Sequence, residues 1–169
     1  IGKGGVWPVW VTVHTPKDIP AGLYKGSIAI KGGFAPQTVV PVEVTVWDFE
    51  LPVTPTLKTA FAFAEAELKA WYKKDVTREQ RLQWYEFLLN HHINPTNIYS
   101  KVPVPSFEDM QFCVDRGLNA FNLTVTWGKT PEKLKELLDT IEGYKKPLAE
   151  KGWWNLAYVY GFDELGPDR

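Results

Sequence analysis

The chain has very few sulfur-containing residues and nearly equal numbers of acidic and basic residues. Both features narrow the range of functions that the sequence suggests. It contains one cysteine and one methionine in 169 residues. A single cysteine cannot form an intrachain disulfide, so we expect Cys113, within a helix-like run, to be a small core residue. The 19 basic residues nearly balance the 20 acidic ones. This balance favours neither nucleic acid nor an anionic membrane as a partner.

Several other signals are missing. No apolar stretch approaches the roughly 20 residues that a membrane-spanning helix needs. The first residues lack the layout of a signal peptide. Metal-ligand spacing, a phosphate-binding glycine loop and a Ser-His-Asp order are also absent from the sequence. We therefore expect no cofactor and no metal, and we expect His91 and His92 to cap the end of a helix.

What the chain does have is material for a core, with 44% hydrophobic and 14% aromatic residues. A proline-rich linker, residues 51–56, separates two regions of different periodicity. In residues 1–50, apolar and polar side chains alternate over 9–14 and 40–46, with a middle strand at 24–31. Three such strands need a second layer, so we predict part of an antiparallel β-sandwich whose other strands precede this sequence.

Residues 57–169 alternate strand-like and helix-like segments. The expected strands are 57–63, 95–99, 120–126 and 155–160. Helices should begin at Thr77, Ser106 and Thr130, where capping signals occur, and Gly117 should end the second helix. Four β/α units in less than half of the about 250 residues of a full barrel predict the first half of a (β/α)8 TIM barrel. The fold class is thus multidomain, a sandwich portion followed by a half-barrel.

An adjacent acid pair, Asp163 and Glu164, follows the last of these strands. In parallel β/α barrels the carboxyl ends of the strands carry the catalytic groups. Both side chains can reach one ligand only if the strand ends or bulges there, and Gly161 would allow such a bend. The pair is therefore the candidate catalytic site.

Four segments resemble glycoside hydrolase family 123 and its relatives, which are N-acetyl-β-galactosaminidases with a β-sandwich followed by a barrel. The segments are residues 10–28 (WVTVHTPKDIPAGLYKGSI), 42–52 (VEVTVWDFELP), 88–95 (LLNHHINP) and 160–164 (YGFDE). Their order and spacing are the specific part of the resemblance. It implies a secreted or periplasmic retaining exo-β-N-acetylhexosaminidase, with Asp163 and Glu164 performing substrate-assisted hydrolysis of a β-linked N-acetylhexosamine glycan.

This chemistry explains two adjacent acids. The 2-acetamido group of the sugar supplies the nucleophile, so the enzyme needs only an acid and an orienting group. Glu164 would protonate the leaving oxygen, and Asp163 would hold the acetamido N–H and stabilise the positive charge that develops. Aromatic side chains would line the sugar site: Trp127 and Tyr99 follow strands, and Tyr158 and Tyr160 lie on the last one.

Two alternatives remain open at this stage. One is a barrel β-glycosidase with its nucleophile glutamate in a missing half, although such enzymes usually have asparagine where Asp163 stands. The other is a non-catalytic carbohydrate-binding or structural protein. Because the sequence stops after the fourth unit, we expect a fragment that lacks the C-terminal half of its barrel and is inactive alone.

Overall fold

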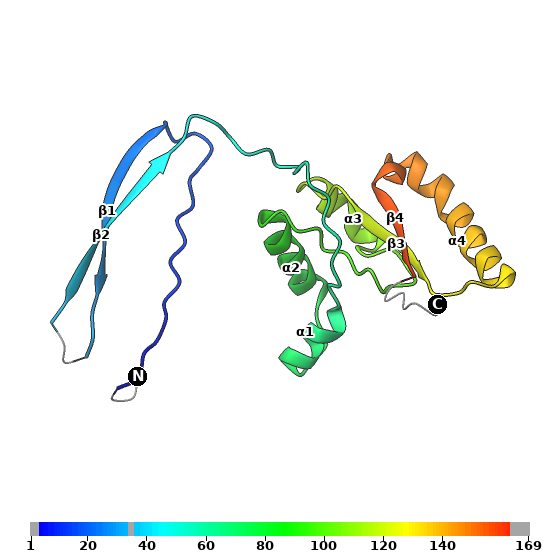
Figure 1. Cartoon of the computed structure of the whole chain (residues 1–169), viewed down its shortest axis with the longest axis horizontal. Helices are drawn as coiled ribbons and strands as arrows, with labels where there is room; N and C mark the ends of the chain where they lie inside the picture. Colours follow the sequence, from blue (N-terminus) through cyan, green and yellow to red (C-terminus); the bar gives the residue numbers. More distant parts are fainter. Residues whose placement is uncertain (1–3, 34–35, 163–169) are drawn as a thin grey trace. The chain divides into compact units, whose positions relative to one another are not determined.

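The computed structural model of the chain describes residues 4–33 and 36–162 (Figure 1). The chain divides into two compact units, Ile1–Leu51 and Pro52–Arg169. Each unit is described by itself. Within the described ranges, no helix is long and apolar enough to cross a membrane.

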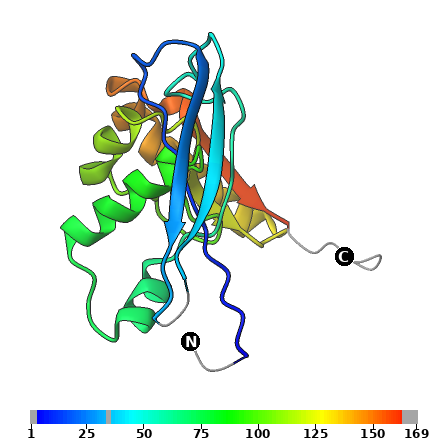
Figure 2. The same cartoon turned by 90° about the vertical axis from the view of Figure 1, so that its left-hand side faces the viewer.

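The first unit is built on one antiparallel hairpin. Strand β1 (Gly22–Ile30) pairs with β2 (Thr38–Val46) along its whole length, as the two ribbons in Figure 2 show. The two faces differ as the alternation in the sequence predicts. Ile28, Val42 and Val44 are half-buried on one face, whereas Lys25 and Glu43 pair across the other at 2.7 Å.

The prediction of a β-sandwich is wrong. The expected strand at residues 9–14 is not a strand, and Val9 and Trp10 are 83% and 92% exposed. The hairpin is a two-stranded sheet, with no second sheet facing it in the described part of this unit. Alternation fixes which side chains share a face, but a ladder also needs a neighbouring strand, and residues 9–14 form none with β1 or β2.

In its described residues, 52–162, the second unit contains four α-helices and one pair of parallel strands. Its elements are α1 (Glu65–Tyr72), α2 (Arg78–Asn90), α3 (Phe107–Val114), β3 (Phe121–Thr126), α4 (Pro131–Glu150), a 3-10 turn (Trp154–Leu156) and β4 (Ala157–Gly161). Helix α4 runs beside the β3–β4 pair in Figure 1 and contacts β3. Leu148 from α4, Phe121 from β3 and Met110 from α3 meet in one fully buried core.

The predicted helix ends are confirmed where the signal is local. Thr77 and Gln80 form a complete capping box, with reciprocal bonds of 3.2 and 3.1 Å, and α2 ends at Asn90 as expected. Thr130 caps α4, and Pro131 occupies its first turn. His91 caps the end of α2, with its Nδ1 2.7 Å from the Phe87 carbonyl. These motifs act within one turn of chain, so the sequence alone specifies them.

A buried carboxylate joins α2 to α3. Asp109 is completely buried and accepts hydrogen bonds from Nε of Arg78 at 2.8 Å and Nε of Arg81 at 3.0 Å. Cys113, one turn later, is also completely buried, and burial raises the pKa of its thiol to about 12. Cys113 is therefore a core residue, as expected, and not a thiolate nucleophile.

The prediction of a half-barrel is also wrong. Only β3 and β4 form a parallel ladder in the described residues. The expected strands at 57–63 and 95–99 touch each other through one antiparallel bridge, Ala62 to Asn97. Pro95 has no N–H to donate, and side chains compete for the remaining backbone groups: Thr59 Oγ1 accepts the Asn94 N–H at 2.8 Å. These segments are held by two backbone bonds at that bridge, Phe63 N–H to the Thr96 carbonyl and Ile98 N–H to the Phe61 carbonyl, and by side chains, but not by an extended ladder.

Gly117 sets the turn between α3 and β3, and its replacement tests that geometry. Its φ is +96°, and an added Cβ would collide with the Val53 carbonyl oxygen. We predict that Gly117→Ala lowers the free energy of unfolding by about 1 to 3 kcal/mol. Gly143→Ala is the matched control, because Gly143 lies inside α4 with nothing within 4 Å of an added Cβ. It should be neutral or stabilising by up to about 1 kcal/mol. Equal effects in urea unfolding would contradict this account.

Candidate functional site

The carboxyl ends of β3 and β4 lie at the same edge of their sheet, because the strands are parallel. Their register runs from Phe121 opposite Ala157 to Thr126 opposite Gly161, with a shift between Asn122 and Thr124. In open α/β sheets, ligands bind outside the carboxyl ends of the strands. The candidate site is therefore this edge.

Three aromatic rings meet there, and we call them the aromatic cluster: Tyr99, Trp127 and Tyr160. The Tyr99 and Trp127 rings stack, with centroids 6.0 Å apart and planes 23° apart. The Tyr160 ring stands edge-on to both, 5.8 Å from Tyr99 and 6.3 Å from Trp127. Tyr99 and Trp127 are each about half exposed, at 51% and 50%. The cluster therefore presents apolar ring surface to solvent in a fixed arrangement.

The buried side chain of Asn122 holds two members of this cluster in place. Its Nδ2 donates to the carbonyls of Asn97 and Ser100, both at 3.1 Å, which fixes the loop that carries Tyr99. Its Oδ1 accepts the backbone N–H of Tyr160 at 3.2 Å. Asn122 is completely buried. One amide thus sets the positions of a loop and a strand end at once.

The chain bends immediately after the cluster. An added Cβ on Gly161 would lie 2.7 Å from the Thr126 carbonyl oxygen, so only glycine lets β4 approach the end of β3 this closely. Phe162 follows with a φ of +59°, a conformation that non-glycine residues rarely adopt. The proposed acids, Asp163 and Glu164, lie outside the described residues.

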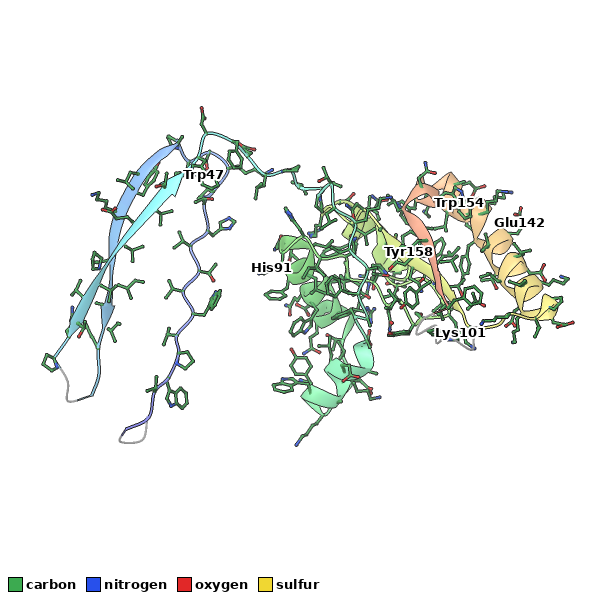
Figure 3. The ribbon with its side chains drawn as sticks, in the orientation of Figure 1. Trp47, His91, Lys101, Glu142, Trp154 and Tyr158 are labelled. Atoms are coloured by element: carbon green, nitrogen blue, oxygen red, sulfur yellow. The ribbon has the colours of Figure 1, made fainter. Side chains whose placement is uncertain are left out.

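Tyr158 does not join the aromatic cluster. Figure 3 shows Tyr158 on β4, and Tyr160 follows two residues later on the same strand. Its hydroxyl is buried and has no hydrogen-bond partner of good geometry in the part of the chain that the structure describes. Burial raises the pKa of this hydroxyl, and the nearby Thr96 offsets part of the rise. The structure thus brings together three of the four predicted sugar-binding residues and separates the fourth.

A cavity of about 340 Å³ adjoins the cluster, and we call it the β3–α4 cavity. Trp127 forms a wall of it, together with the last residues of β3 and the first turns of α4. Its charged lining residues, among those described, are Lys101, Lys133 and Glu136. Lys133 Nζ lies 2.7 Å from Glu136 Oε2, and this pairing lowers the pKa of Glu136.

Asn122, Lys101 and Lys133 are not among the site residues that the sequence predicts. A signal for Asn122 does exist: β3 reads Phe-Asn-Leu-Thr-Val-Thr, and its polar residues alternate with core residues. A strand with one polar, buried face needs side-chain partners for that face. The lysines have no comparable pattern. Among residues 4–33 and 36–162, no group of three His, Cys, Asp or Glu side chains is arranged to hold a metal ion.

Comparison with known proteins gives no relative: no family model, no curated protein and no solved structure matches this chain.

The role of Asn122 can be tested by truncation. Asn122→Ala would leave the Tyr160 N–H and several loop carbonyls without their partner, so we predict a loss of about 2 to 4 kcal/mol in unfolding free energy. The exposed Asn155, replaced by Ala, is the matched control and should change stability by less than about 0.5 kcal/mol. Denaturant unfolding followed by tryptophan fluorescence measures both. A loss below 1 kcal/mol for Asn122→Ala would show that the network is not required.

Proposed function

We propose that this protein is a glycoside hydrolase that acts on β-linked N-acetylhexosamine, most simply N-acetylgalactosamine, by substrate-assisted catalysis. The observation that carries the proposal is the aromatic cluster at the carboxyl ends of β3 and β4. This cluster comes directly before the acid pair in the sequence. Asp163 follows Tyr160 by three positions, and three residues of chain span at most about 11 Å.

The geometry of the cluster suits a sugar. Galactose-type rings have an apolar face of C–H groups that stacks on aromatic rings, while their hydroxyls need polar partners. The stacked Tyr99–Trp127 pair offers half-exposed ring surface for that apolar face. A positioned sugar is what an acid/base residue near this edge would require.

The acid pair supplies the two remaining parts of the reaction. In the proposed mechanism the acetamido carbonyl oxygen attacks the anomeric carbon while Glu164 gives its proton to the leaving oxygen. Asp163 accepts the acetamido N–H and balances the charge of the oxazolinium ion. Glu164 then takes a proton from the water that opens this intermediate. The resemblance to glycoside hydrolase family 123 in residues 160–164 supports the same assignment.

A second candidate function is sugar binding without hydrolysis. The cluster alone could serve it, because stacking on Tyr99 and Trp127 does not need either acid. The two functions differ in what they demand of Asp163 and Glu164. Binding experiments and turnover experiments therefore address them separately.

Sugar binding is tested on the 169-residue chain. We predict that N-acetylgalactosamine perturbs the NMR signals of Trp127, and that Trp127→Ala weakens binding about two- to tenfold through loss of stacking. Trp71→Ala is the matched control, since Trp71 lies on α1 and is 82% exposed. It should leave the affinity unchanged. The same loss in both variants, or no binding at all, would contradict the proposed site.

Hydrolysis is tested on the full-length gene product. Glu164→Gln should lower kcat on an unactivated N-acetyl-β-galactosaminide by about two to four orders of magnitude, with a smaller loss when the leaving group needs no proton. Asp163→Ala should lower turnover and weaken binding of a thiazoline that mimics the oxazoline intermediate. The acetamido-free galactoside is the control and should be nearly inert. Wild-type rates in Glu164→Gln would overturn the assignment, and a 2-fluoro glycoside adduct on a protein carboxylate would exclude substrate assistance.

A further inference from the structure

The β3–α4 cavity shares a wall with the aromatic cluster. Trp127 stacks on Tyr99 and also lines the cavity, which continues over the carboxyl end of β3 to the first turns of α4. A sugar stacked on Trp127 would therefore have an opening of about 340 Å³ beside it. That volume is enough for a substituent or part of a neighbouring sugar.

The charges that line this cavity do not cancel. Lys133 and Glu136 neutralise each other as an ion pair, 2.7 Å apart. Lys101 is the third charged group of the lining, and it forms no ion pair within the described residues. Figure 3 shows Lys101 at the carboxyl end of the strands, the same end as the cluster. Among the described residues, the charged side chains of the lining therefore sum to one positive charge.

Lys101 is also held close to β3 by its backbone. The Thr124 hydroxyl donates to the Lys101 carbonyl at 3.2 Å, and the Asn122 amide bonds the preceding residue, Ser100. The backbone of Lys101 is thus fixed to β3, the strand that Trp127 directly follows. Its ammonium group also acts on the cavity, since it contributes to the lowered pKa of Glu136.

We propose that the β3–α4 cavity binds an anionic substituent, a sulfate ester or a carboxylate, of the glycan whose sugar stacks on Trp127. Lys101 supplies the unbalanced positive charge, and Lys133 supplies a second donor. The substrate class is then an acidic glycan containing N-acetylhexosamine. This inference rests on the proposed function, because it places the sugar on the aromatic cluster.

The test compares charged and neutral sugars on the 169-residue chain by NMR titration. The ligands are N-acetylgalactosamine, its 4-sulfate and 6-sulfate, and a disaccharide of N-acetylgalactosamine and a uronic acid. At least one anionic ligand should bind about two- to fivefold more tightly than the neutral sugar at low salt. The gain should shrink as ionic strength rises. The ligand that gains identifies the source of the anion, a sulfate ester or a carboxylate.

Two substitutions should act in opposite directions on the anionic ligand. Lys101→Gln should remove the gain, and Glu136→Gln should increase it about twofold or more, because it removes the one negative charge of the lining. Neither should change the affinity for neutral N-acetylgalactosamine. The matched controls are Lys145→Gln and Glu142→Gln, a similar ion pair further along α4 that lies outside the cavity lining. Both controls should leave every affinity unchanged.

The outcomes separate this inference from the proposed function. If neutral and anionic sugars bind equally well and both depend on Trp127, the anion site is excluded while sugar binding stands. If the control substitutions change the affinity as much as Lys101→Gln does, the effect comes from the net charge of the protein and not from the cavity, and the inference fails. If no sugar binds, the proposed function and this inference fail together.

Discussion

The buried amide of Asn122 is the interaction on which the site depends. It donates to backbone carbonyls of the loop that carries Tyr99 and accepts the N–H of Tyr160 on β4. The backbone N–H of Asn122 also donates to Thr96 Oγ1, at 2.8 Å. A pair of side-chain amides repeats the pattern just before β3, where Asn94 and Asn119 bond each other and Asn119 Nδ2 donates to the Pro55 carbonyl. Buried amides of this kind fix one arrangement, because any shift leaves several polar groups without partners.

The contrast between local motifs and these long-range amide bonds explains which parts of the fold could be predicted from the sequence. The Thr77–Gln80 capping box and the Thr130–Pro131 start need only neighbours within one turn, so the residues alone specify them. The segments at 57–63 and 95–99 have strand-like composition, but whether they join a ladder depends on residues far along the chain. Asn94, Asn119 and Asn122 donate to backbone carbonyls there, and the two segments form a single bridge, Ala62 to Asn97, without an extended ladder in the described residues. The barrel prediction failed at this non-local step.

The spatial arrangement of the candidate residues was predictable to a similar depth. Trp127 follows β3 directly, so its place at the carboxyl end required only the strand boundary. Tyr160 and Tyr158 have the same parity on β4, and parity alone could not separate them. They differ in position along the strand: Tyr160 is next to the carboxyl end, whereas Tyr158 lies opposite Asn122, one pair in from the amino end of the ladder. The contribution of Lys101 depends on a loop geometry that Asn122 imposes, and no local pattern of residues encodes it.

The absence of a barrel in the described residues leaves the proposed sugar site possible. Ligands also bind at the carboxyl ends of strands in open parallel sheets, which are not closed into a barrel. It does change which mechanism is simplest. A double displacement needs a second carboxylate about 5 Å from the acid, held by another element on the far side of the sugar. Substrate assistance takes its nucleophile from the sugar and needs one acid and one orienting carboxylate, the roles proposed for Glu164 and Asp163, which are neighbours in sequence. A short pair of parallel strands with an aromatic cluster at its edge therefore suits the proposed substrate assistance better than a mechanism that places its two carboxylates on distant strands.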